Sequence, residues 1–176
     1  MTEARQPEPW LRGTLSEVPA VARAVLHALE LAEEDLLKWC GPLDQRQLNA
    51  QPTGVASVAF QIRHIARSID RLLTYAESRQ LDETQMAVLR AELDTDANKQ
   101  DVFQELRTAI GKAEMRIRVL ATSDLAAPRV VGRKELPTTL GGLLVHVAEH
   151  TQRHVGQAIT TAKFVRGMPS NPSYSD

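Results

Sequence analysis

Three of the five histidines in the chain recur at intervals of four residues, as His146, His150 and His154. On an α-helix each residue turns by about 100°, so a step of four returns to within ~40° of the starting direction. The three imidazoles therefore form one stripe along a predicted helix. Leu143 and Val147 share that side of the helix, so the stripe is expected to lie on a buried face.

Two interpretations of this stripe are open from the spacing alone. A buried imidazole needs a partner, because an unpaired polar group away from water costs roughly 1–3 kcal/mol. A divalent metal would satisfy two histidines at once, since side chains at i and i+4 direct their ring nitrogens to a common point. Alternatively, the histidines are hydrogen-bonded within a core or partly solvated at its edge.

Four long segments with apolar residues at three-and-four spacing predict the helices that position these histidines. The segments cover residues 16–40, 57–76, 98–121 and 137–165. Ser57 and Asn98 are suited to cap the second and third helices, and Pro137 and Thr138 are expected to open the fourth. Four amphipathic helices, long connections and no convincing strand predict an all-α four-helix bundle.

The remaining segments are predicted to be connections and chain ends. Residues 1–14 are expected to form an irregular arm, residues 15–165 a single domain, and residues 166–176 a loose tail. A short helix is expected at Thr84–Leu93. Arg129–Lys134 has extended character, but the sequence offers no partner strand for it.

Composition narrows the classes of protein to which the chain can belong. A net charge of −1 and a pI near 6.5 give no electrostatic reason to expect a nucleic-acid partner. No apolar run approaches the ~20 residues that span a bilayer, and the first residues lack the basic-then-apolar order of a signal peptide. The single Cys40 cannot form an intrachain disulfide. Together these features predict a cytoplasmic protein without a membrane partner.

Four of the five histidines fall in the second and fourth predicted helices, because His64 lies in the second. One histidine from the second helix and two from the fourth would supply three nitrogen ligands to a metal. The remaining coordination positions would stay open to water or substrate, which is typical of catalytic sites. Such a metal lowers the pKa of a bound water or ionises a thiol. His27, in the first helix, is expected to pack in the core.

Other templates for a metal or nucleophile site fit the sequence less well. His146-Val-Ala-Glu149-His150 matches the His-x-x-Glu-His pattern of inverted zinc peptidases, with Glu149 as general base. Too little chain follows this motif to complete a peptidase domain. The two Glu-x-x-His motifs of a di-iron bundle are missing, as are Cys-x-x-Cys, a P-loop and Gly-x-Gly-x-x-Gly.

Two segments carry a resemblance to a known family. His146–Gln157, which ends in His-Val-Gly-Gln, resembles the fourth-helix signature of the DinB-like (damage-inducible) superfamily of metal-binding four-helix bundles. Ser57–Leu72 is similar to the second helix of that family, and the resemblance covers roughly residues 15–165. It implies a divalent metal, zinc or nickel, held by three histidines. These would be His64, His150 and His154.

The same resemblance suggests roles for neighbouring side chains. His146 would contact a ligating imidazole, contact substrate or simply pack in the core. Gln157 lies on the face of the stripe and would orient His154 or contact a ligand. Arg67, three residues after His64, is expected to be a solvated charge, with a place in the pocket as the alternative. The catalytic residues themselves remain unknown from the sequence.

Two functional hypotheses of different class follow. In the first, the protein is a metal-dependent enzyme acting on a small molecule, of the hydrolase or low-molecular-weight thiol transferase type. Relatives in the family include transferases and isomerases that use mycothiol, bacillithiol or glutathione. In the second, the protein is a non-catalytic bundle with a structural metal or none, acting through a protein partner or as a homodimer. Small residues on the fourth helix, Gly141, Ala148 and Gly156, would let another helix approach closely.

Overall fold

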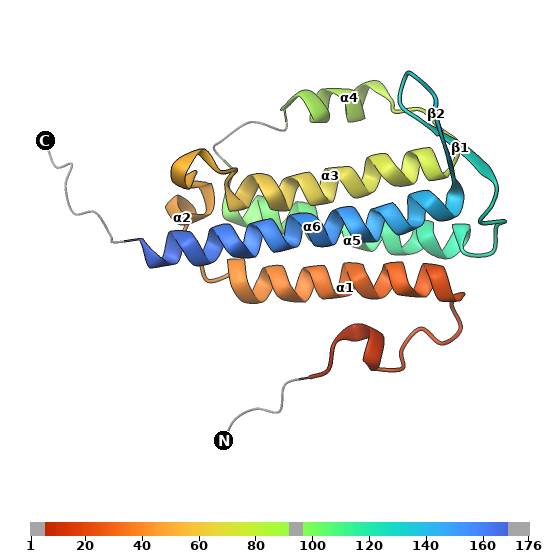
Figure 1. Cartoon of the computed structure of the whole chain (residues 1–176). Coiled ribbons are helices and arrows are strands. Elements are labelled where there is room, and N and C mark those ends of the chain that lie inside the picture. The colour runs from red at the N-terminus through yellow and green to blue at the C-terminus, as the bar shows by residue number, and fades with distance from the viewer. Residues whose placement is uncertain (1–5, 92–96, 169–176) are drawn as a thin grey trace, which may run out of the picture.

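Four long helices form the body of the protein, in a computed structural model that describes residues 6–91 and 97–168 (Figure 1). They are α1 (Ala20–Cys40), α3 (Val58–Ala76), α5 (Lys99–Leu120) and α6 (Leu140–Gly167). Each buries an apolar stripe against the others, as the sequence pattern predicts. None of the described helices is long and apolar enough to cross a membrane. The predicted all-α four-helix bundle is confirmed.

The smaller elements lie in the connections between these helices. A 3₁₀ turn, η1 (Pro9–Leu11), precedes α1, and the α1–α3 connection contains α2 (Gln45–Asn49) and η2 (Pro52–Gly54). The short helix α4 (Glu83–Arg90) lies between α3 and α5, where a helix was predicted from Thr84 onward. Residues 92–93 of that prediction lie outside the described residues, as does most of the predicted C-terminal tail.

Side-chain caps fix the starts of three of the four long helices. The Ser57 hydroxyl accepts from Phe60 N at 3.1 Å, and the Asn98 amide oxygen accepts from Gln100 N at 2.8 Å. Both caps lie at the predicted positions, and each satisfies a backbone donor that has no partner within the helix. The third cap is Thr139, and α6 begins at Leu140, three residues after the predicted Pro137.

The start of α1 differs from the predicted Ser16. Pro19 occupies the N-cap with an extended backbone, and the helix begins at Ala20. A proline disfavours helical dihedrals in the residue before it, so the residues up to Val18 cannot join the helix. Leu15 adopts a positive φ of 57°, which also interrupts any helix there.

A β-hairpin precedes α6, where the sequence analysis expected no strand pairing. Strand β1 (Pro128–Val131) pairs antiparallel with β2 (Leu136–Thr139), and Val131 faces Leu136 across the ladder. Pro137 and Thr138 therefore lie in β2, and the expectation that they open the fourth helix was wrong. Pro137 obscured the strand because proline lacks a ladder donor and is tolerated only at an edge, which a two-stranded hairpin provides.

The first turn of α6 is anchored to the loop before the hairpin. Gly141 N donates to Leu125 O at 2.8 Å, and a Cβ at Gly141 would lie only 3.1 Å from that oxygen. Glycine at position 141 thus allows the close approach of the Leu125 carbonyl, which is a contact within the chain. Ala148 also packs against the core, whereas Gly156 faces open space. The small residues proposed for a dimer contact therefore do not form one exposed face.

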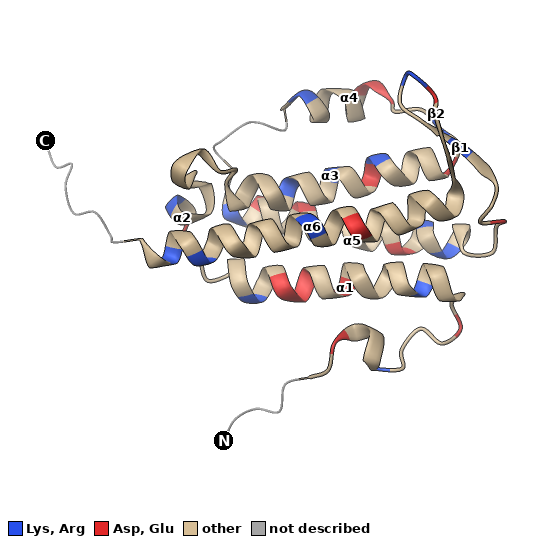
Figure 2. Ribbon diagram, viewed as in Figure 1, with Lys and Arg blue, Asp and Glu red and all other residues tan. Residues whose placement is uncertain are grey.

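The core lies between the four long helices and is continuous along their length. Its largest fully buried side chains are aliphatic, and they come from every long helix and from α2 and its flanking residues. They include Leu29, Leu36, Leu48, Ile62, Ile65, Ile69, Leu73, Leu106, Ile117 and Leu144. Positive and negative residues are interspersed along the long helices (Figure 2), in keeping with the small net charge.

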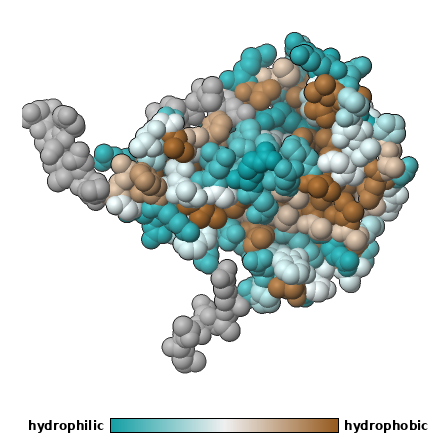
Figure 3. Space-filling view, in the orientation of Figure 1, coloured by the Kyte–Doolittle hydropathy of each residue, from teal (hydrophilic) through white to brown (hydrophobic). Residues whose placement is uncertain are grey.

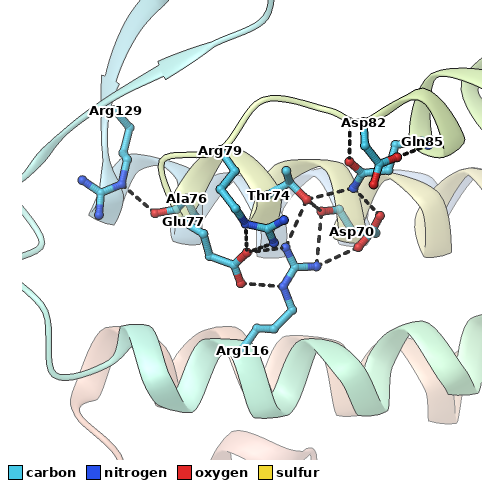
Figure 4. A network of polar contacts seen from close by, with 9 residues as sticks. All are labelled: Asp70, Thr74, Ala76, Glu77, Arg79, Asp82, Gln85, Arg116 and Arg129. Carbon is cyan, nitrogen blue, oxygen red and sulfur yellow. Dashed lines mark hydrogen bonds and ion pairs between the residues drawn. The ribbon is translucent and has the colours of Figure 1, made fainter.

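A polar network centred on Arg116 joins α5 to α3 (Figure 4). Its guanidinium donates to Asp70 Oδ1 at 2.7 Å and to Glu77 Oε1 at 2.7 Å. Gln85 brings α4 into the network by donating to Asp70 Oδ2 at 2.6 Å. From β1, Arg129 donates to the carbonyl of Ala76 at 2.6 Å (Figure 4). Arg116, Gln85 and Arg129 thus attach α5, α4 and β1, respectively, to the second half of α3.

This network predicts a pH dependence of stability that depends on Glu77. Burial favours a raised pKa for Glu77, but hydrogen bonds and charge from Arg116 and Arg79 outweigh it and leave the pKa lowered. A carboxylate with a lowered pKa stabilises the fold above its unfolded-state pKa of about 4.3, and this contribution is lost as the pH falls through its folded-state pKa. Glu77→Gln should lower the free energy of unfolding by about 1–2 kcal/mol at pH 7. It should also make the loss of stability below pH ~5 shallower than in wild type.

Urea denaturation between pH 3 and pH 7 measures this effect. Glu83→Gln, on the exposed first turn of α4, is a matched control and should change both quantities less. Wild type and Glu77→Gln curves of the same steepness in acid would contradict the role given to Glu77.

Candidate metal centre

Three histidines from two facing helices converge in the structure. His64 comes from the first half of α3, and His150 and His154 come from the middle of α6. One ring nitrogen of each lies within 4.8 Å of those of the other two. His64 Nε2 and His150 Nε2 are 3.0 Å apart. The group contains no carboxylate or thiol from the described part of the chain.

The donor set and its spacing fit a divalent transition metal. Imidazole nitrogens ~2.0–2.1 Å from a tetrahedral ion lie ~3.3 Å from one another. The separation of 3.0 Å between His64 Nε2 and His150 Nε2 is close to this value. Neutral imidazole suits zinc, nickel, copper and iron rather than magnesium or calcium, which prefer oxygen ligands. Three protein ligands leave a coordination position for water or a small molecule.

Gln61 fixes the orientation of His154. Its side-chain oxygen lies 2.6 Å from His154 Nδ1, and Gln61 is only 4% exposed. Because an amide oxygen can only accept, the proton of a neutral His154 lies on Nδ1. The lone pair of the neutral ring then lies on Nε2. Such outer hydrogen bonds set the tautomer and the direction of metal-binding histidines.

A second buried polar side chain, Ser68, lies against His150. The Ser68 hydroxyl is 3.3 Å from His150 Nε2, and it accepts from Arg71 Nη2 at 3.1 Å. The Phe60 ring stacks on His64 with an angle of 15° between the planes. The histidines are therefore held from several sides before any ion binds.

The electrostatics of the cluster keep His150 neutral. Burial lowers the pKa of His150 to about 4, and the neighbouring imidazoles of His154 and His64 act in the same direction. A histidine must be neutral to bind a metal through its ring nitrogen. At neutral pH, therefore, His150 needs no deprotonation step before ligation.

His146 lies outside the three-nitrogen group, although it shares the stripe. Its ring is 5.5 Å from that of His150, and its side chain is 44% exposed. Its Nδ1 is 3.4 Å from Glu149 Oε2, and Glu149 also pairs with Arg153. The structure thus groups His150 with His64 and His154 rather than with His146 and Glu149. This arrangement does not support the inverted zinc peptidase template.

The other residues singled out in the sequence have varied surroundings. Gln157 is exposed, and the hydrogen bond expected of it at His154 comes from Gln61. Arg67 is directed toward α5, where its Nε donates to Glu105 Oε1 at 2.7 Å. With a side chain only 9% exposed, Arg67 is not the solvated charge that was expected. It lines a cavity rather than the histidine cluster.

His27 and Cys40 are both structural. His27 is buried in α1, as expected, and its Nε2 lies 3.1 Å from the hydroxyl of Thr14 in the N-terminal segment. Cys40 is 0% exposed at the end of α1, and burial raises its pKa to about 12. A thiol that stays protonated and buried is not a nucleophile.

Sequence reasoning assigned no role in the site to Gln61 or Ser68, although both lie on the His64 side of the second helix. A signal was present, because positions three before and four after His64 lie on the same face of α3. Glutamine and serine on a helix carry no distinctive motif, however, and their partners lie on α6. Only the packing of α3 against α6 brings the two pairs together.

Comparison with known proteins agrees with this geometry. The sequence profile of the DinB superfamily matches residues 28–158, which include all three histidines and both helices that carry them. A comparison with curated protein sequences finds no match. With most of the bundle matched and its histidine cluster assembled, the chain belongs to the DinB superfamily.

Proposed function

We propose that this protein is a cytoplasmic, divalent-metal-dependent enzyme acting on a small molecule, of the low-molecular-weight thiol transferase or hydrolase type. The observation that carries the proposal is the convergence of His64, His150 and His154 without a fourth described protein ligand. A structural site is usually closed by four protein ligands, whereas a catalytic site keeps a position for the reactant. Zinc or nickel is the metal that we propose for this donor set.

The metal would supply one piece of chemistry: lowering the pKa of a thiol or water at its open position. The protein would supply position and surroundings. Gln61 holds the His154 ring in place, and Ser68 lies against His150. The Phe60 ring stacks on His64 and helps to hold its orientation.

The thiol, where one is used, would have to come from outside the protein. Cys40 is buried and protonated, and it is the only cysteine in the chain. We therefore propose bacillithiol, mycothiol or glutathione as the co-substrate class. In the transferase reaction the thiol sulfur would form a bond to an electrophilic carbon, and the group displaced from that carbon would leave with its electron pair.

His146 is placed to exchange protons with solvent. It is half-exposed, lies one turn before His150 and contacts Glu149. A histidine ring can accept a proton at one nitrogen and donate one from the other, which suits it to proton transfer. We propose that His146 takes up the proton released from the thiol or water. This role follows from its place beside the cluster rather than within it.

Turnover assays test the proposal. Metal-loaded protein should conjugate one of the three thiols to 1-chloro-2,4-dinitrobenzene with release of chloride, or hydrolyse p-nitrophenyl acetate. A dependence on added thiol would distinguish the transferase from the hydrolase. The rate should fall to background in a His150→Ala, His154→Ala variant. Rates equal in that variant and in wild type, or no turnover with any pair, would contradict the enzymatic proposal.

The second candidate function is the non-catalytic bundle that acts through a partner or a homodimer. The observation that favours it is a set of exposed apolar side chains toward the hairpin end of the bundle, where hydrophobic residues gather (Figure 3). Val130, Leu136 and Val145 are among them. Dimerisation stays a prediction, because an exposed apolar surface alone does not identify its partner.

A further inference from the structure

A cavity separate from the histidine cluster lies between α3, α4 and α5. Its volume of about 370 Å³ is within the range of small-molecule sites, roughly 300–1,000 Å³. Most of its wall is apolar and comes from all three helices. The apolar lining residues are Ala66, Ile69, Leu73, Val88, Ala109 and Ala113. None of its lining residues belongs to the three-histidine group.

Charged side chains surround this apolar wall, and cations outnumber anions among them. Arg67, Arg71, Lys112 and Arg116 line the cavity, against Asp70 and Glu105. Asp70 is engaged by Arg116 (Figure 4). Glu105 is shared between two arginines, since Arg63 also donates to it at 3.3 Å. Both acids in the lining are therefore already neutralised.

Two of the cations retain donors for a further anion. Arg67 is nine-tenths buried, and its Nη1 is buried without a hydrogen-bond partner. Lys112 forms no ion pair with residues 6–91 or 97–168, which are the described parts of the chain. A buried guanidinium N–H without an acceptor is unfavourable, and guanidinium and ammonium groups are the usual partners of carboxylates.

α4 covers the cavity through few contacts. None of its residues is buried, and Gln85 ties it to α3 by donating to Asp70 and Thr74. Val88 faces the cavity from this helix. An apolar ligand body enclosed here would bury Val88 and Ala109, which are both half-buried in the free protein. Each Å² removed from water stabilises binding by roughly 25 cal/mol.

We propose that the cavity between α3, α4 and α5 binds a small amphipathic carboxylate. The apolar body of the ligand lies against Ala109 and Val88, and the carboxylate accepts hydrogen bonds from Lys112 and Arg67. A cationic amphiphile of the same length binds more weakly, because its ammonium meets Lys112 and the guanidinium of Arg67. This site is independent of the histidine cluster, so it goes beyond the enzymatic function proposed above.

Calorimetric titration of the full chain with decanoate tests the proposal, with decylamine as the cationic probe of equal length. Decanoate should bind with a stoichiometry near one, and decylamine at least about tenfold more weakly. Ala109→Phe fills the cavity and should weaken decanoate binding at least about tenfold. Lys112→Met removes a charge at an exposed position without disturbing the core, and should weaken binding roughly three- to tenfold.

Matched variants outside the cavity identify the site of binding. Ala87→Phe introduces the same ring at an exposed position of α4 that does not line the cavity. Lys134→Met removes the same charge from the hairpin turn. Both should bind decanoate as wild type does. Equal affinity for decanoate and decylamine, unchanged affinity in Ala109→Phe, or no binding at millimolar decanoate would each overturn the proposal. The outcome is independent of metal content and of turnover.

Discussion

Replacing His150 and His154 together by alanine should abolish metal binding. Wild type protein should hold about one equivalent of a divalent transition metal, and the double variant less than about a tenth of that. The reason is geometric: His64 would remain alone, and a single imidazole cannot hold an ion against water. Elemental analysis of untagged protein after reconstitution and gel filtration measures the difference.

Two other histidines of the chain provide controls for this experiment. His146→Ala removes an imidazole from the same helix and stripe, but from outside the three-nitrogen group. His27→Ala removes one from α1, where it contacts Thr14. Both variants should keep about one equivalent of metal. Full occupancy in the double variant, or its loss in His146→Ala, would show that the ligands have been assigned wrongly.

Removing the side-chain oxygen of Gln61 should weaken metal binding without removing any ligand. In Gln61→Leu, His154 loses the acceptor that fixes its tautomer and its ring orientation. Loss of such an outer hydrogen bond typically lowers metal affinity by about 10- to 100-fold. Competition with a chromophoric chelator at fixed pH measures the dissociation constant directly.

The polar variants at this position separate orientation from simple packing. Gln61→Glu keeps an acceptor for His154 Nδ1, so its affinity should stay equal to wild type or rise. Gln157→Leu makes the same amide-to-leucine change at an exposed position of α6 and should alter affinity less than about twofold. An unchanged dissociation constant in Gln61→Leu would show that Gln61 does not orient His154. A large loss of metal affinity in Gln157→Leu would indicate that Gln157 does so instead.

The helices could be predicted because their signals are local. Ser57 caps α3 and Asn98 caps α5 at the predicted positions, and each cap bonds to backbone only two or three residues away. The hairpin could not be predicted, because neither strand satisfies its backbone groups alone. Its recognition required the pairing of Val130 with Pro137, and proline argues against a strand when it is considered by itself.

The site could be predicted to a similar extent. The stripe on α6 is a local pattern, and the expected packing of the second and fourth helices added His64. The resemblance to a family then selected His150 and His154 from the stripe. The contacts that support the histidines could not be predicted from the sequence, because Gln61 contacts His154 only through the packing of α3 on α6. Arg67 was misjudged for the same reason. Its burial depends on Glu105 of α5, and an arginine with no visible partner in the sequence is ordinarily exposed.

The reactivity of the buried Cys40 thiol can report local unfolding of the helix bundle. A protonated, fully enclosed sulfur does not react with disulfide reagents while the bundle is closed. Its labelling rate therefore reports how often the end of α1 separates from the core. Any ion or small molecule that binds the closed form alone must slow that labelling in proportion to its occupancy. Ligands can thus be ranked by how much they slow Cys40 labelling, measured by mass spectrometry, before the reaction that the protein catalyses is known.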